Sequence, residues 1–146
     1  MSGWWVLSLI PAVLIFQNLK QPKLGLEDGR FKALGRKPNA VSTQASDEKR
    51  RVDVLDCKGV TSPISLAGRV LSDMPGARVV KEEGPYIYAV FTTPMLRFRD
   101  DVELYFDETA QCLHFRSASR AGYSDMGVNY KRYRAFAERF RQLAAG

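Results

Sequence analysis

The spacing of hydrophobic residues changes several times along this chain, and each change predicts a different element. Residues 51–56 and 102–106 alternate between apolar and polar side chains, which is the pattern of a strand buried on one face. Residues 77–82 and 86–93 favour two strands joined as a hairpin, and residues 111–116 favour another strand. The hydrophobic pattern therefore predicts five strands.

Two helices are predicted in addition. The first begins at Ser62-Pro63, a cap residue followed by proline, and ends at Pro75-Gly76. Asn129 can cap the second, whose apolar stripe is Tyr133, Phe136, Ala137, Phe140 and Leu143. The order of elements predicts an α+β domain over residues 49–146, a mostly antiparallel sheet of about five strands with two helices on one face.

The last two predicted strands place charged residues on a single face. If they pair across a turn at residues 107–110, Glu103 lies beside His114 and Asp101 beside Arg116. This register predicts a polar face opposite the apolar one, with both signs of charge close together.

The chain begins with nineteen uncharged residues, rich in apolar side chains and with Trp4 and Trp5 near one end. As a helix they would reach about 28 Å, close to the thickness of a hydrocarbon core. No Lys or Arg precedes this run and no small-residue cleavage pattern follows it, which favours a permanent transmembrane anchor over residues 1–19. A cleaved signal peptide and a buried helix are the alternatives.

Residues 20–48 have no sustained period and predict an extended arm, either a tether draped over the domain or a segment that binds a partner. Cations follow the apolar run at once: Lys20, Lys23, Arg30, Lys32, Arg36 and Lys37. The positive-inside rule places the domain on the cytoplasmic side of a bacterial inner membrane or the matrix side of a mitochondrial inner membrane.

Composition and charge narrow the classes of function. The chain has 146 residues, 45% of them hydrophobic, with a net charge of +6 and a pI near 9.5. These values favour a globular domain with an acidic partner: an anionic lipid, a protein surface or nucleic acid. Nucleic acid is the weakest of the three because no recognition motif accompanies the charge. Cys57 and Cys112 lack metal-ligand spacing, so we expect neither a metal nor a cofactor.

The stretch from Arg116 to Asn129 combines charges, hydroxyls and glycines between a strand and a helix. Near the free amides of a helix start, such groups can hold a phosphate, a lipid headgroup or a partner's carboxylate. The alternative is structural, with Arg116 and Arg120 paired to nearby carboxylates at a crowded corner. The candidate interaction residues are Arg116, Ser117, Ser119, Arg120, Tyr123, Asp125, Asn129, Asp101, Glu103, Asn39 and Ser42.

Two further candidates carry less weight. Cys112, His114 and Glu103 supply a nominal nucleophile, base and acid, but neighbours on one strand face lie ~6–7 Å apart at their Cα atoms. A surface His114 paired with Glu103 is the simpler interpretation. The last helix is basic and can face either anionic headgroups or solvent.

The stretches Arg116–Asn129, Leu24-Gly25-Leu26, Pro38–Gln44 and Asp100–Phe106 together resemble the domain-of-unknown-function family 1499. The resemblance runs from about Leu24 to about Arg134. It implies that related domains occur as accessory subunits of respiratory complex I in some lineages. Members usually carry a cysteine on either side of the Pro-Asn pair. Because Leu34 and Ala40 occupy those positions here, a covalent or metal role of that pair cannot operate in this chain.

We therefore expect a non-enzymatic membrane-anchored interaction module, an accessory subunit of a larger membrane complex such as respiratory complex I. Its expected partners are the membrane, other subunits of that complex and anionic lipid. The alternative is a protein that binds a small anion or lipid headgroup, or an uncharacterised enzyme, through the face of Glu103, His114, Arg116 and Arg120.

Overall fold

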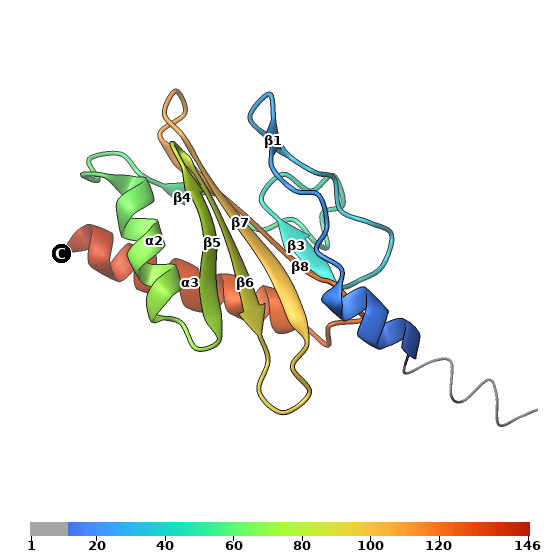
Figure 1. Ribbon diagram of the computed structural model, residues 1–146. Helices are drawn as coiled ribbons and strands as arrows, with labels where there is room; N and C mark the ends of the chain where they lie inside the picture. The colour runs from blue at the N-terminus through green and yellow to red at the C-terminus, as the bar shows by residue number, and fades with distance from the viewer. Residues whose placement is uncertain (1–11) are drawn as a thin grey trace, which may run out of the picture.

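An antiparallel sheet of six strands forms the centre of the protein, and two helices cover one of its faces (Figure 1). The computed structural model describes residues 12–146. The sheet order is β3-β8-β7-β6-β5, and β4 pairs with the start of β8. The strands are β3 (Ala40–Ser42), β4 (Leu55–Asp56), β5 (Ala77–Glu83), β6 (Tyr86–Thr92), β7 (Arg99–Asp107) and β8 (Cys112–Ser119), and the helices are α2 (Pro63–Asp73) and α3 (Val128–Ala145). The predicted α+β class is confirmed.

The main hydrophobic core lies between the sheet and the helices. Val102 and Leu104 alternate with polar residues along β7, so both belong to this core, where they are fully buried. From α3, Phe136 and Phe140 enter the same core and stack with ring centroids 6.0 Å apart. The stripe predicted for this helix is confirmed except at Leu143, which is 37% exposed.

The second face of the sheet is covered by the segment that precedes β3. This segment, residues 20–39, is called the arm below, and it contains the hairpin of β1 (Leu26–Glu27) and β2 (Arg30–Phe31). Phe31 is buried in a small cluster with Tyr88 and Val90 of β6. Because the arm and the helices lie on opposite faces, nearly all of β6 is buried. Polar side chains of β7 and β8 on this face are therefore shielded from water.

The predicted register of the last hairpin is wrong by two residues. Glu103 lies opposite Arg116, and Asp101 lies opposite Ala118. The turn begins one residue later than predicted: Asp107 still pairs with Cys112, and Gln111, with a φ of 52°, belongs to the turn. A shift of two residues keeps every side chain on its predicted face, because side chains alternate with a period of two.

Three other local predictions differ from the structure. The region expected to form only an extended arm contains β3, which is an edge strand of the sheet. The strand predicted over residues 51–56 shortens to β4, and Arg51 makes a single bridge to Ser42. Asn129 does not cap α3, because Gly127 occupies that position and Asn129 is buried inside the first turn.

The N-terminal part of the described chain is a short helix over residues 12–19. Within residues 12–146, no helix has the length and apolar character needed to cross a membrane. The predicted anchor over residues 1–19 includes residues 1–11, which lie outside the described residues.

Candidate functional site

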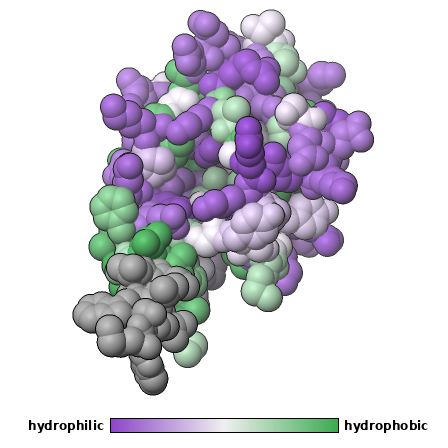
Figure 2. Space-filling view, turned by 90° about the vertical axis from the view of Figure 1, so that its right-hand side faces the viewer, coloured by the Kyte–Doolittle hydropathy of each residue, from purple (hydrophilic) through white to green (hydrophobic). Residues whose placement is uncertain are grey.

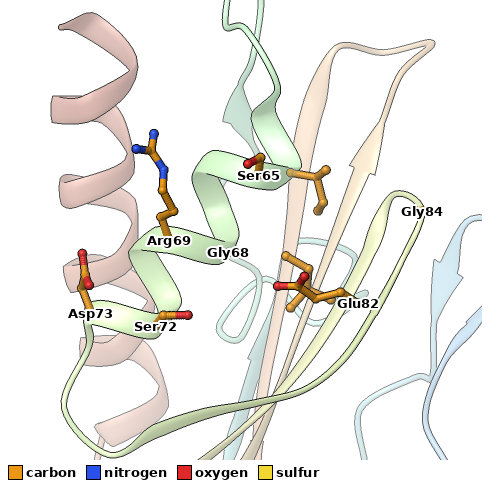
Figure 3. Close-up of a pocket in the computed structure, with 9 residues that line it drawn as sticks. Ser65, Gly68, Arg69, Ser72, Asp73, Glu82 and Gly84 are labelled. Carbon is orange, nitrogen blue, oxygen red and sulfur yellow. The ribbon is translucent and has the colours of Figure 1, made fainter.

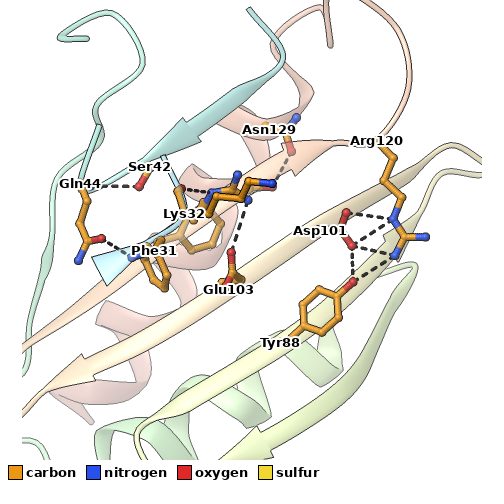
Figure 4. Close-up of polar contacts among 12 residues, drawn as sticks. Phe31, Lys32, Ser42, Gln44, Tyr88, Asp101, Glu103, Arg120 and Asn129 are labelled. Carbon is orange, nitrogen blue, oxygen red and sulfur yellow. Dashed lines mark hydrogen bonds and ion pairs between the residues drawn. The ribbon is translucent and has the colours of Figure 1, made fainter. Parts of the chain in front are cut away.

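A buried ion pair joins β7 to the end of β8 on the face beneath the arm (Figure 4). The Arg120 guanidinium donates to both Asp101 carboxylate oxygens, with Nη2 2.8 Å from Oδ1 and Nε 2.9 Å from Oδ2. The Tyr88 hydroxyl donates to Asp101 and accepts from Arg120 at 3.1 Å. Hydrogen bonding to Asp101 raises the pKa of Arg120, and burial raises that of Tyr88. These groups form a closed triangle in which each charge is matched.

A second buried pair lies next to the first. Arg116 Nη1 is 3.4 Å from Glu103 Oε1, and the Tyr86 hydroxyl donates to Glu103 Oε2 at 2.5 Å. Arg116 also donates from Nε to the Lys32 carbonyl of the arm at 3.0 Å. Burial raises the pKa of Glu103 and lowers that of Arg116, because desolvation outweighs their attraction. The alternative in which Arg116 and Arg120 pair with neighbouring carboxylates is the one that forms.

A third polar group lies on the helix side of the sheet, where Asn129 is its centre. The Asn129 amide donates to Ser119 Oγ at 2.8 Å and to the Asn39 carbonyl at 2.9 Å, and its oxygen accepts from Ser117 at 2.5 Å. Arg132 donates to the same oxygen at 2.8 Å and forms an ion pair with Asp100 at 2.7 Å. This network ties α3 to the end of the sheet, so these residues fix a corner of the fold.

The other predicted site residues lie around this corner. Asp125 accepts from the amides of Gly127 and Asn129 at 2.9 and 3.1 Å, and therefore takes over the capping that was predicted for Asn129. Ser42 accepts from the Gln44 amide at 3.1 Å. Tyr123 is 71% exposed, unlike the buried corner residues.

A cleft of about 760 Å³ opens beside the two ion pairs, between the arm and the end of β8. This basic cleft has Arg116 and Arg120 in its lining, together with five exposed cations from the arm region: Lys20, Lys23, Lys32, Arg36 and Lys37. Among the described residues, none of these five forms an ion pair. The single carboxylate of the lining, Asp101, is already bound to Arg120. The cleft therefore presents uncompensated positive charge.

Sequence reasoning used these five cations only to orient the chain in a membrane. Their clustering around one cleft depends on the fold of the arm, which periodicity does not predict. Sequence reasoning also missed Tyr86 and Tyr88, which donate to the carboxylates of the two ion pairs. Their hydroxyls reach these carboxylates only because β6 pairs with β7.

Cys112 and His114 lie within hydrogen-bond range of each other, but the acid that the sequence placed beside them does not. Cys112 Sγ is 3.6 Å from His114 Nε2, while Thr43 Oγ1 is 3.0 Å from Nδ1. Burial raises the pKa of the thiol and lowers that of the imidazole, which favours the neutral form of each group. The predicted contact between Glu103 and His114 is absent, because Glu103 pairs with Arg116. Within residues 12–146, no cluster of metal-ligating side chains occurs.

Another cavity, of about 480 Å³, lies between α2 and β5 (Figure 3). Arg69 and Asp73 line it from the helix and Glu82 from the strand. Its charges are mixed in sign, so it favours no class of ligand. The basic cleft is the stronger candidate.

Comparison with known proteins agrees with the resemblance seen in the sequence. A family model described as "Protein of unknown function (DUF1499)" matches residues 31–140, which is most of the chain. No curated protein and no solved structure matches it. The matched residues contain the whole sheet and both ion pairs beneath the arm.

Proposed function

This chain belongs to the DUF1499 family, and we propose that it is a non-enzymatic, membrane-anchored module whose basic cleft binds the phosphate of an anionic lipid headgroup. The observation that carries this proposal is the set of five exposed arm cations around the cleft, which form no ion pair within the described chain. The two arginines at the base of the cleft, in contrast, are already paired with Glu103 and Asp101. Lysine and arginine side chains that face anionic lipid contribute roughly 1 kcal/mol each.

The chemistry of the cleft favours binding over catalysis. Asp101 and Glu103 each accept from an arginine and a tyrosine hydroxyl, so donors of the chain itself already occupy both carboxylates. In the part of the chain that the structure describes, every buried side-chain nitrogen and oxygen has a hydrogen-bond partner. Because the polar groups at the base of the cleft are already hydrogen-bonded to one another, they favour a role in positioning an anion.

The membrane part of the proposal rests on the sequence of the N-terminal segment. Its nineteen residues without charge lead directly into Lys20 and Lys23, two of the cations of the cleft. A span over these residues would hold the cleft at the level of the headgroups, on the cytoplasmic or matrix side.

A second candidate is the docking of this module onto a larger membrane assembly, such as respiratory complex I. The length of the cleft favours it, because cations from Lys20 to Lys37 line a space larger than one phosphate requires, and an acidic segment of a partner subunit would fit. Co-purification from intact membranes in mild detergent tests this candidate. Migration of the chain alone would contradict it.

The test of the lipid proposal measures affinity in detergent. The full chain in uncharged micelles is titrated with short-chain phosphatidylglycerol, with phosphatidylcholine and with inorganic phosphate. Phosphatidylglycerol should bind, and the triple variant Lys20→Ala/Lys32→Ala/Lys37→Ala should weaken its binding by at least about tenfold, because three of the five unpaired cations are removed.

The matched control removes the same charge elsewhere. Lys131, Arg134 and Arg139 are exposed on α3, and their replacement by alanine should leave the affinity within about a factor of three. Equal loss in both variants would mean general charge attraction, and no loss in the first would exclude the cleft. Equal binding of inorganic phosphate would identify a free anion as the ligand in place of a lipid.

A further inference from the structure

Three segments that are distant in sequence expose large apolar side chains. In the turn between β6 and β7, Met95 is 96% exposed and Leu96 74% exposed. In the loop before α3, Met126 is 87% exposed. In the helix over residues 12–19, Ile15 and Phe16 are 60% and 66% exposed. Single exposed apolar residues are ordinary on a protein surface, but a contiguous group of them marks an interaction site.

Hydrogen bonds and packing join the three segments. Asn18 donates to the Arg97 carbonyl at 2.9 Å and accepts from the Arg99 amide at 2.6 Å, which holds the N-terminal helix against the β6–β7 turn. The same turn adjoins the loop before α3, because Phe98 of the turn and Met126 of the loop line a common cavity of about 240 Å³. The exposed apolar residues therefore share one end of the molecule, called the apolar end below.

The residues that surround the apolar end indicate that it contacts a membrane. The helix over residues 12–19 lies here, and the eleven residues that precede it in the sequence carry no charge. Cations flank it on the domain side, with Lys20 and Lys23 in the basic cleft and Arg97 in the turn itself. Figure 2 shows hydrophobic side chains gathered at the lower end of this face and hydrophilic ones above them. Apolar groups bordered by cations match the boundary between acyl chains and anionic headgroups.

We infer that the apolar end inserts into the headgroup boundary of the bilayer, and that Met95, Leu96 and Met126 are the side chains that enter it from the two loops of the domain. This inference rests on the proposed membrane attachment and adds a second contact to it. Turn tips present these side chains as projections, which lipid accommodates without a complementary surface. The contact would fix the orientation of the domain, so that the basic cleft faces headgroups.

The test places a polarity-sensitive fluorophore on single cysteines of the full chain in vesicles of phosphatidylcholine and phosphatidylglycerol. Met95→Cys and Met126→Cys are labelled in a Cys112→Ser background, where the remaining Cys57 is fully buried. Both labels should show blue-shifted emission and quenching by lipids that carry a nitroxide high on the acyl chain.

The matched control is Val54→Cys, which is 42% exposed in the native chain and adjoins β4 at the other end of the sheet. A water-soluble quencher should reduce the fluorescence of its label, and the lipid nitroxide should not. Labels at 95 and 126 that behave like the one at 54 would overturn the inference. Protection from both quenchers would also overturn it, since it would mean contact between copies of the chain.

This experiment separates the two proposals. The Lys20→Ala/Lys32→Ala/Lys37→Ala variant should lose affinity for anionic lipid and keep the quenching at 95 and 126. If the labels at 95 and 126 are not quenched by the lipid nitroxide while the affinity for the headgroup is intact, the proposal for the basic cleft stands and the inference of an inserted apolar end is contradicted.

Discussion

At the scale of single residues, the charges buried beneath the arm form ion pairs, and the arm shields these pairs from water. Asp101 and Arg120 have side chains only 3% and 5% exposed, so water does not screen either charge. Removing one partner of such a pair costs far more than the pair contributes in total, because the remaining charge is left buried alone. We therefore expect Asp101 and Arg120, both candidate interaction residues in the sequence, to contribute to the stability of the fold.

Replacing Arg120 by alanine should lower the free energy of unfolding by about 3–5 kcal/mol, because the Asp101 carboxylate loses its cation. Urea unfolding of the full chain in uncharged micelles measures this change. The control is Arg139→Ala, an exposed position on α3, where the effect should stay within about 0.5 kcal/mol. Similar values for the two variants would mean that the buried pair contributes nothing to folding.

Glu103 should make stability depend on pH in an unusual direction. Burial raises its pKa above the ordinary value of 4.5, so between these two pKa values the folded protein holds a proton that the unfolded chain has released, and only above the raised pKa is Glu103 the ionised partner of Arg116. Stability contributed by this group is therefore full below pH 4.5 and decreases as pH rises through the raised pKa. In Glu103→Gln this decrease should vanish. Urea unfolding of both proteins at several pH values above 4 tests this, and a difference between them that does not change with pH would contradict it.

At the scale of elements, the strand and helix types were largely predictable and their connections were not. The alternation in β7 and the helical stripe of α3 are long enough for burial to dictate the pattern. β3 has only three residues, all of them buried, and therefore offers no alternation to detect. The register of β7 and β8 depended on Gln111 adopting a left-handed φ, a choice made by the turn and invisible to periodicity.

For the candidate site, too, the sequence predicted the face on which each side chain lies but not its neighbours in space. The faces of Asp101, Glu103, Arg116 and Arg120 were predicted, because alternation alone sets them. Pairing of the two arginines with nearby carboxylates was one of the alternatives, but the predicted cross-strand neighbours were wrong, because a shift of two residues exchanges every one of them. The cover supplied by the arm, which turns surface charges into buried ones, comes from contacts of Phe31 that no local pattern encodes.

The start of β5 offers a test of turn geometry. Gly76 has a φ of 80°, and a Cβ there would lie 2.5 Å from the carbonyl oxygen of Thr92. Alanine at this position should cost at least about 2 kcal/mol, since it adds a backbone clash to the left-handed penalty of roughly 1 kcal/mol.

Gly84 is the matched control for that substitution. Its φ of 55° is also left-handed, but an added Cβ would meet no atom within 4 Å. Gly84→Ala should therefore show only the conformational penalty in thermal melts. Equal losses of melting temperature at the two glycines would mean that the close approach to Thr92 relaxes freely.

At the scale of the whole molecule, the proposed binding of an anion would be coupled to folding through the arm. The basic cleft is built from the arm on one side and β8 on the other, so an anion bound there holds the two together. A ligand that binds only the folded state stabilises it in proportion to the logarithm of its concentration, about 2.7 kcal/mol at one hundred times Kd. The net charge of +6 makes this stabilisation sensitive to salt.

Saturating phosphatidylglycerol in uncharged micelles should therefore raise the melting temperature of the full chain by roughly 5–10 °C. Phosphatidylcholine should not raise it, because its headgroup has no net charge for the arm cations to bind. At about 1 M salt the Debye length falls to ~3 Å, and most of the increase should disappear. In the Lys20→Ala/Lys32→Ala/Lys37→Ala variant the increase should be small at any salt concentration. An increase that survives both high salt and the triple substitution would mean that the lipid stabilises the protein through its acyl chains, away from the basic cleft.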